Sequence, residues 1–182
     1  ISVINQKKFS ITDISSKVIN RNPSGPFTTS TLQQTASSRL GFGASRTMQI
    51  AQKLYQGIEI EGETIGLITY MRTDGTNLSK DAISEFRNYI KNEIGNEYLP
   101  DNVLNYSGKK AKNAQEAHEA IRPTDIIRSP QSIKKYLSPD QNKLYNLIWS
   151  RALSSQMESA KFDRNTITIT SDKNDTICKA SG

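Results

Sequence analysis

Strand-like patterns occur at both ends of this 182-residue chain, whereas its long middle part has helical patterns. Near the start, residues 9–11 and 17–19 flank a polar stretch, which predicts two short strands joined by a turn. Near the end, threonine and isoleucine alternate over 166–170, and a turn at 172–175 leads into a strand-like run at 176–180. Because an isolated hairpin is only marginally stable in water, we expect both hairpins to join in one antiparallel sheet.

Everything between the two hairpins is then inserted as a second domain. The turn-forming residues Pro23-Ser24-Gly25-Pro26 mark the start of the insertion, so we expect a β-rich region from 1–26 and 159–182 and a mainly helical domain over 27–158. The predicted fold class is α+β. The chain begins at Ile1 and stops at Gly182 inside a strand-like pattern, which indicates a piece of a longer protein.

The inserted segment opens with two helical patterns and a hairpin, which together are the outline of a winged-helix module. Two further helices are predicted after the hairpin, each with a serine at its start. The predicted limits are a first helix capped in the box 30–33 and stopped by Gly41 and Gly43, a second from Ser45 to Gly57, strands at 58–60 and 64–71, and helices from Ser79 to Gly95 and from Ser138 to Leu153.

Composition narrows the choice of partners and sites. The chain has 24 Lys and Arg against 18 Asp and Glu, a net charge of +6, which is compatible with a polyanionic partner. A single cysteine and a single histidine exclude an internal disulfide, a cysteine-based zinc site and a histidine cluster, so we expect no metal site in this chain. No apolar run reaches the length of a membrane span and no signal segment opens the chain, which predicts a cytoplasmic protein without a membrane partner.

The sequence Tyr70-Met71-Arg72-Thr73-Asp74 follows an apolar run at 65–69. On an extended strand, Tyr70 and Arg72 point to the same face, where one phosphate could contact both side chains. A phenol is a poor nucleophile at neutral pH and needs a base, a cation or a metal nearby. Arg72 can supply that cation, because a guanidinium holds two phosphoryl oxygens at once.

Asp74 lies two residues further on and could orient a histidine or a water molecule from the same side. His118, the only histidine, is its candidate partner. The plainer interpretation is a strand in which Tyr70 is partly buried, Arg72 forms a surface ion pair, and Asp74 and Gly75 make a turn.

Four stretches resemble bacterial type IA DNA topoisomerases, in order and at fitting separations. These stretches are 26–34, 38–42, 66–74 and 117–123. The resemblance implies that Tyr70 attacks one DNA strand and becomes joined to its 5′ phosphate, that a second DNA segment passes through the gap, and that the break is then resealed. Negative supercoils would be relaxed in this way without ATP, in an enzyme located at the bacterial nucleoid.

The same resemblance implies roles for individual residues. Arg72 would hold the scissile phosphate, and Asp74 with His118 would form a supporting network near the DNA. Further candidate DNA contacts are Arg39, Thr73 and Arg122. One departure is local: the family usually has serine after the aspartate of the motif, where this chain has Gly75, and glycine lacks the hydroxyl that could contact the following segment or a phosphate.

The resemblance also implies parts that this chain lacks. Family members carry a Toprim domain, whose acidic residues bind Mg²⁺, and a further domain that grips the single strand. The chain would then contribute the catalytic-tyrosine domain, over 27–158, and parts of the β-rich arch, over 1–26 and 159–182. We expect such a fragment to bind single-stranded DNA and to be inactive alone.

Two alternatives remain. A winged-helix regulator without catalysis would need a basic recognition helix, whereas the second predicted helix has only Arg46 and Lys53 as cations. A tyrosine recombinase or type IB topoisomerase would use several arginines and a histidine-x-x-arginine pair. Here three residues separate His118 from Arg122, and the tyrosine precedes both, so spacing and order argue against that class.

Overall fold

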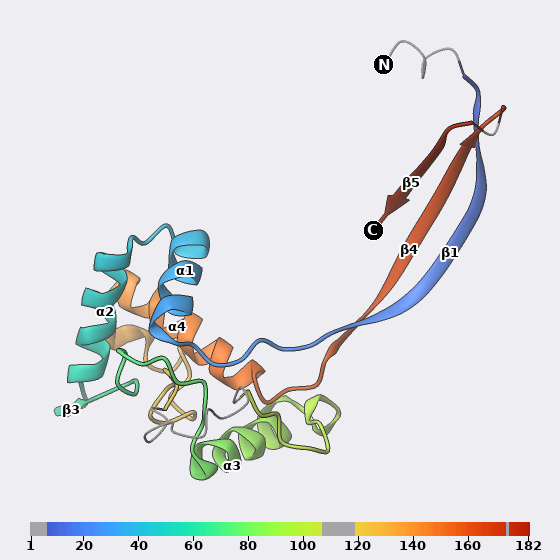
Figure 1. Ribbon diagram of the computed structural model, residues 1–182. Helices are drawn as coiled ribbons and strands as arrows, with labels where there is room; N and C mark the ends of the chain where they lie inside the picture. Colours follow the sequence, from blue (N-terminus) through green and yellow to red (C-terminus); the bar gives the residue numbers. More distant parts are fainter. Residues whose placement is uncertain (1–6, 107–118, 174) are drawn as a thin grey trace, which may run out of the picture. The chain divides into compact units, whose positions relative to one another are not determined.

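The computed structural model describes residues 7–106, 119–173 and 175–182 of the chain (Figure 1). The chain forms two compact units, one from Ile1–Asn22 with Ser159–Gly182 and the other from Pro23–Glu158. It thus leaves the first unit after Asn22, slightly before the predicted boundary at residue 26, and returns at Ser159. The identification of these units with the arch and the catalytic-tyrosine domain stays a prediction.

The first unit is an antiparallel sheet with the strand order β1-β4-β5 (Figure 1). Its strands are β1 (Phe9–Arg21), β4 (Ala160–Ser171) and β5 (Ile177–Ser181), so the predicted C-terminal hairpin and the common sheet are confirmed. The predicted N-terminal hairpin is wrong, because β1 is one continuous strand that pairs with β4 along its length. The polar residues that predict a turn are tolerated in this strand, because β1 is solvent-exposed nearly throughout. They include a β-bulge at Thr12, whose Oγ1 lies 2.8 Å from Thr170 Oγ1.

The second unit begins with two helices, α1 (Thr29–Leu40) and α2 (Ala44–Gln56), which pack against each other and against α4 (Pro139–Ser154). Helix α1 begins earlier than predicted, because Thr28 and Thr31 form the capping box, with each hydroxyl accepting from the other residue's backbone N–H. Gly41 ends α1 in the left-handed conformation with φ 69°, as predicted. Gly43 caps α2 with φ −63°, so its predicted left-handed role and the predicted Ser45 cap are wrong.

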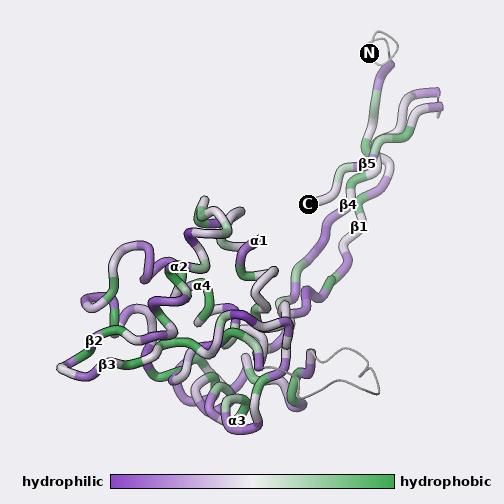
Figure 2. The backbone as a smooth tube through the Cα atoms, turned by 60° about the vertical axis from the view of Figure 1, so that its left-hand side comes forward, coloured by the Kyte–Doolittle hydropathy of each residue, from purple (hydrophilic) through white to green (hydrophobic). Residues whose placement is uncertain are grey.

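A short hairpin follows α2, with strands β2 (Ile58–Ile60) and β3 (Glu63–Ile65). In Figure 2 the tip of this hairpin is purple, for hydrophilic residues. The predicted strand to Met71 is too long, because β3 ends at Ile65 and the chain then returns to α2, where Leu67 N–H donates to Leu54 O at 2.8 Å. A helix pair plus hairpin is present, while the winged-helix classification stays a prediction.

The remaining helices are α3 (Lys80–Tyr89), continued by a π-helical turn at Ile90–Ile94, and α4 (Pro139–Ser154), with short 3-10 turns at Asn96–Tyr98 and Lys134–Tyr136. Ser79 and Ser138 cap α3 and α4 as predicted. Two apolar clusters form the core of the unit. The larger contains Phe27, Leu32, Leu54, Leu67, Ile68, Met71, Ile121, Leu144, Tyr145 and Ile148, and the smaller contains Phe86, Ile90, Ile126, Ala152 and Leu153. None of the described helices combines the length and the apolar character needed to cross a membrane.

Candidate active site

Residues 66–74, here called the tyrosine segment, lie between β3 and α3, and their backbone bends at Thr69, Met71 and Arg72. Tyr70, Arg72 and Asp74 are exposed, whereas Met71 and Thr73 between them are buried. Exposed and buried side chains thus alternate over 70–74, and Ile68 forms an isolated antiparallel bridge with Pro123. All three polar side chains of the motif are therefore accessible to solvent.

The end of α2 holds the first part of the tyrosine segment. A Cβ atom at Gly66 would lie 2.7 Å from Tyr55 O, so only glycine permits this close approach. The rings of Tyr55 and Tyr70 meet edge to face, with centroids 5.4 Å apart. Tyr70 is still 47% exposed, so its ring is supported on one side and its phenol is accessible to a ligand.

Thr29, the first residue of α1, holds the last part of the tyrosine segment. Its backbone N–H donates to Thr73 O at 2.8 Å, and its Oγ1 donates to Met71 O at 2.8 Å and accepts from Thr73 N–H at 2.8 Å. These contacts lie on either side of Arg72 in the sequence. The backbone that carries Arg72 is therefore fixed while its side chain remains outside.

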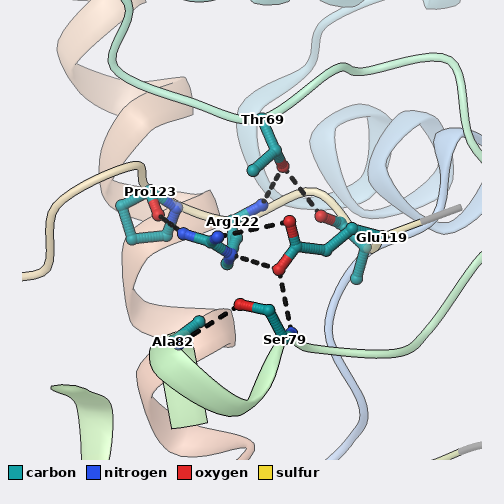
Figure 3. Close-up of polar contacts among 7 residues, drawn as sticks. Thr69, Ser79, Ala82, Glu119, Arg122 and Pro123 are labelled. Atoms are coloured by element: carbon teal, nitrogen blue, oxygen red, sulfur yellow. Dashed lines mark hydrogen bonds and ion pairs between the residues drawn. The ribbon is translucent and has the colours of Figure 1, made fainter. Parts of the chain in front are cut away.

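The middle of the segment is tied to residues 119–124 through Thr69 (Figure 3). Thr69 Oγ1 donates to Ala120 O at 2.7 Å and accepts from Arg122 N–H at 3.0 Å, and Thr69 N–H donates to Arg122 O at 2.9 Å. One residue before the tyrosine, three hydrogen bonds thus join two stretches that lie about fifty positions apart in the sequence. This attachment limits the movement of the Tyr70 backbone.

Arg122 and Glu119 form a two-pronged ion pair beside Thr69 (Figure 3). Arg122 Nε donates to Glu119 Oε1 at 2.7 Å, and a terminal nitrogen donates to Oε2 at 3.2 Å. Glu119 Oε1 also accepts from Ser79 N–H at 3.0 Å, at the start of α3. Burial alone would raise the pKa of Glu119, but the hydrogen bonds from Arg122 and Ser79 outweigh it and lower that pKa. The pair thus links α3 to the tyrosine segment.

Replacing Arg122 by methionine should lower the free energy of unfolding by about 2 kcal/mol, because Glu119 would be left without its cation in a partly buried position. The side chains of Arg122 and Glu119 are only 14% and 31% exposed. The single tryptophan, Trp149 in α4, reports unfolding of this unit by its fluorescence in urea. The matched control is Arg128→Met, which breaks a longer ion pair to Asp125 of the same i,i+3 spacing and should cost less than about 1 kcal/mol. Equal losses in the two variants would contradict the proposed difference.

The difference in the free energy of unfolding between wild type and Arg122→Met should depend on pH in a defined direction. Because the pKa of Glu119 is lowered in the folded chain, its contribution is complete above the pKa of an unfolded glutamate, about 4.3, and is lost as the pH falls through the lower folded value. The gap between wild type and Arg122→Met should therefore narrow below about pH 4.

Arg72 has no ion-pair partner among the described residues, so the surface ion pair of the plainer interpretation is absent there. Its side chain lines a groove of about 730 Å³ along α2. A guanidinium without a carboxylate partner, two residues after an exposed tyrosine, is suited to bind an anion that approaches the phenol.

The other predicted site residues lie in different environments. Thr73 is only 8% exposed and its Oγ1 accepts from Gly75 N–H at 3.0 Å, while Asp74 is exposed beside Gly75. Arg39 is exposed in the last turn of α1, is not among the residues that line the groove, and lies close enough to Arg151 to help burial lower the pKa of that arginine. His118 lies outside the described residues. DNA contacts by Arg39, Thr73 and Arg122 stay predictions, and the guanidinium of Arg122 is already held by Glu119 and Pro123 O.

The described residues do not fit a metal site. Across 7–106, 119–173 and 175–182, no three His, Cys, Asp or Glu side chains gather in a way that could hold an ion. Asp74 is the only carboxylate of the tyrosine segment, and a single carboxylate is a poor basis for binding Mg²⁺.

Reasoning from sequence missed Thr29, Tyr55 and Glu119 as residues that position the site. Glu119 and Thr29 form their contacts with partners that are distant in sequence. Tyr55 follows Leu54 at the apolar end of α2, yet it is 41% exposed and contacts Tyr70. Gly66, a glycine inside the apolar run at 65–69, is the sequence signal for the close approach of two backbones.

Comparison with known proteins supports the relation of the whole chain to one family. A family model described as DNA topoisomerase matches residues 1–182. DNA topoisomerase 1 of Rickettsia typhi is 51% identical over 176 residues, or 97% of this chain, and DNA topoisomerase 1 of Xylella fastidiosa strain 9a5c is 48% identical over all of it. The solved full-length topoisomerase I of Thermotoga maritima matches 99% of the chain with a TM-score of 0.82 and 38% identity.

The chain spans only part of each relative. It covers 22% of the two curated relatives named above and 28% of the Thermotoga maritima chain. The activities of those longer proteins therefore depend on further residues beyond the segment that this chain matches.

Proposed function

Since the chain belongs to the bacterial type IA DNA topoisomerase family, we propose that it carries the nucleophile and the phosphate clamp with which a longer enzyme cuts and reseals one DNA strand. The observation that supports this most is the tyrosine segment itself. Tyr70 and Arg72 are presented to solvent by a backbone that is hydrogen-bonded on both sides, and Arg72 has no ion-pair partner among the described residues. Such a site is preorganised for a phosphate.

In the proposed reaction, the Tyr70 phenol oxygen attacks the phosphorus of a phosphodiester. A bond forms between that oxygen and the phosphorus, the bond to the 3′ oxygen breaks, the phenol loses its proton, and the 3′ oxygen gains one. Arg72 holds two phosphoryl oxygens and offsets the charge that develops during in-line displacement. After a second DNA segment has passed through the gap, the 3′ hydroxyl attacks the phosphotyrosine and restores the strand.

The supporting residues are part of the same proposal. Asp74, on the exposed side of the segment, and His118 would form a network beside the phosphate. Mg²⁺ would be bound by a Toprim domain elsewhere in the longer protein, and we assign no step of this chain to it. A strand-gripping domain, a preference for single-stranded DNA and a place at the nucleoid in the cytoplasm complete the proposal. A regulator without catalysis is not favoured, because the family match covers all 182 residues.

The isolated chain should bind single-stranded DNA weakly and leave supercoiled plasmid unrelaxed, because the proposed metal-binding half of the site is not in it. Agarose gels of plasmid incubated with the chain and Mg²⁺ measure this. If the chain alone relaxes plasmid and this activity persists after further purification, the proposal that part of the active site lies in other domains is wrong.

The decisive test of the proposed reaction maps the DNA end that becomes attached to protein. A chimera in which this chain replaces the matching segment of Xylella fastidiosa DNA topoisomerase 1, 48% identical over the whole chain, supplies the remaining domains. Denaturing the chimera during turnover with end-labelled single strands should trap protein on the 5′ phosphate. Attachment through a 3′ phosphate would contradict the proposal and indicate the tyrosine recombinase or type IB class.

A further inference from the structure

The groove beside Arg72 follows one face of α2. Residues of that helix that recur at helical spacing line it, together with Arg72 and Asp140. Its polar lining from α2 consists of the cations Arg46 and Lys53, the amides Gln49, Gln52 and Gln56, and the hydroxyl of Ser45. The cations and amides supply donors along most of the length of the helix.

The charge of the groove favours an anion. Arg46, Lys53 and Arg72 face a single carboxylate, Asp140, which leaves a net charge of +2. Asp140 is already paired with Arg46 and lies in the first turn of α4. Helix α2 contains no acidic residue, so nothing on this face of the helix opposes a polyanion.

The lining of the groove favours a nucleic-acid backbone over stacked bases. Among the described residues, no aromatic side chain lines it, whereas phosphates and sugars match its cations and amides. The choice of a single strand rests on the proposed function, in which one DNA strand is held at Tyr70.

The groove shares one residue with the candidate site. Arg72 lines it, and Tyr55 of the same helix, outside the groove lining, contacts the ring of Tyr70. On the basis of the function proposed above, we propose that the α2 groove binds the sugar–phosphate backbone of the single DNA strand that adjoins the phosphate held at Tyr70, with Lys53 neutralising one phosphate and Arg46 leaving its ion pair with Asp140 to neutralise another.

The test compares the salt dependence of DNA binding. The whole 182-residue chain is titrated into a short fluorescein-labelled single strand, and anisotropy gives the affinity between about 50 and 200 mM salt. Each phosphate contact on a single strand contributes about −0.7 to the slope of log affinity against log salt, so Arg46→Gln with Lys53→Gln should make the slope shallower by about 1.4. The variant would then lose about sevenfold less affinity than wild type over that range.

The matched control removes the same charge from the same unit. Lys91 and Lys134 are exposed, lie outside the groove and have no ion-pair partner among the described residues. Lys91→Gln with Lys134→Gln should leave the slope within about 0.3 of wild type. Equal slopes in the two double variants would overturn the proposal.

Two further measurements separate the alternatives. Lys53→Gln alone, which breaks no ion pair, should change the slope by about 0.7, and Trp149 fluorescence verifies that each variant is folded. A duplex of the same sequence that binds more tightly, with the same sensitivity to the groove variant, would overturn the assignment to a single strand. If DNA is not attached through its 5′ phosphate, the proposed reaction is wrong, but the difference in salt slope between the groove variant and its control can still be observed. If the two double variants have the same salt slope, the groove proposal is wrong, and the attachment result is unaffected.

Discussion

Replacing Tyr70 by phenylalanine is expected to abolish covalent attachment of DNA and relaxation of plasmid by the chimera, a loss of at least about 10⁴-fold. The substitution removes the attacking oxygen and leaves the ring. The contact with Tyr55 should therefore persist, and no hydrogen bond of the phenol is lost among the described residues. Labelled single strands trapped by denaturing gel measure attachment, and a plasmid gel measures relaxation.

Tyr98 offers a matched control for that experiment. It is 46% exposed, against 47% for Tyr70, and lies in a 3-10 turn outside the tyrosine segment. Tyr98→Phe should retain attachment and relaxation at the level of the chimera with the unchanged segment. Attached DNA in the Tyr70→Phe chimera would mean that another side chain is the nucleophile.

The sequence was sufficient for features that depend on neighbouring residues. Ser79 and Ser138 predicted the starts of α3 and α4, because a serine side chain caps the N–H groups within the next turn. Gly41 and Gly57 predicted helix ends, where the backbone has positive φ. The motif spacing predicts that Tyr70, Arg72 and Asp74 share one side; all three are exposed, and their common side stays a prediction.

Features that depend on distant residues were not accessible in the same way. The polar stretch inside β1 reads as a turn locally, and only its pairing with β4, about 150 residues later, makes it a strand. The tyrosine segment reads as a strand, yet its hydrogen bonds go to α1, α2 and residues 119–124. Arg122 reads as a free cation in the sequence, but Glu119 and Ser79 define its surroundings.

The positioning contacts explain why an exposed site can still be precise. Thr29 and Thr69 hold backbone atoms on both sides of Tyr70, so the cost of ordering the segment is met during folding rather than when DNA binds. The side chain of Arg72 then has to order only its own rotamers around a phosphate. Its contribution should therefore appear in the rate of attack as well as in affinity.

Replacing Arg72 by alanine should lower the rate of covalent attachment by the chimera about 10²- to 10³-fold at saturating DNA, because the clamp stabilises charge that develops in the transition state. Arg72→Lys should recover only part of the loss, since an ammonium supplies charge without the planar fork that binds two oxygens. Arg164, an exposed arginine of β4 in the other unit, gives the control Arg164→Ala, for which the saturating rate should be unchanged.

The saturating rate and the DNA concentration for half-maximal rate together distinguish a clamp on the reacting phosphate from a general DNA contact. A general contact made equally before and during the reaction would raise the DNA concentration needed for half-maximal rate and leave the saturating rate intact. A clamp on the reacting phosphate lowers the saturating rate itself. If Arg72→Ala changed only the half-saturating concentration, Arg72 would be a further contact of the α2 groove, and the cation that assists Tyr70 would have to come from another part of the enzyme.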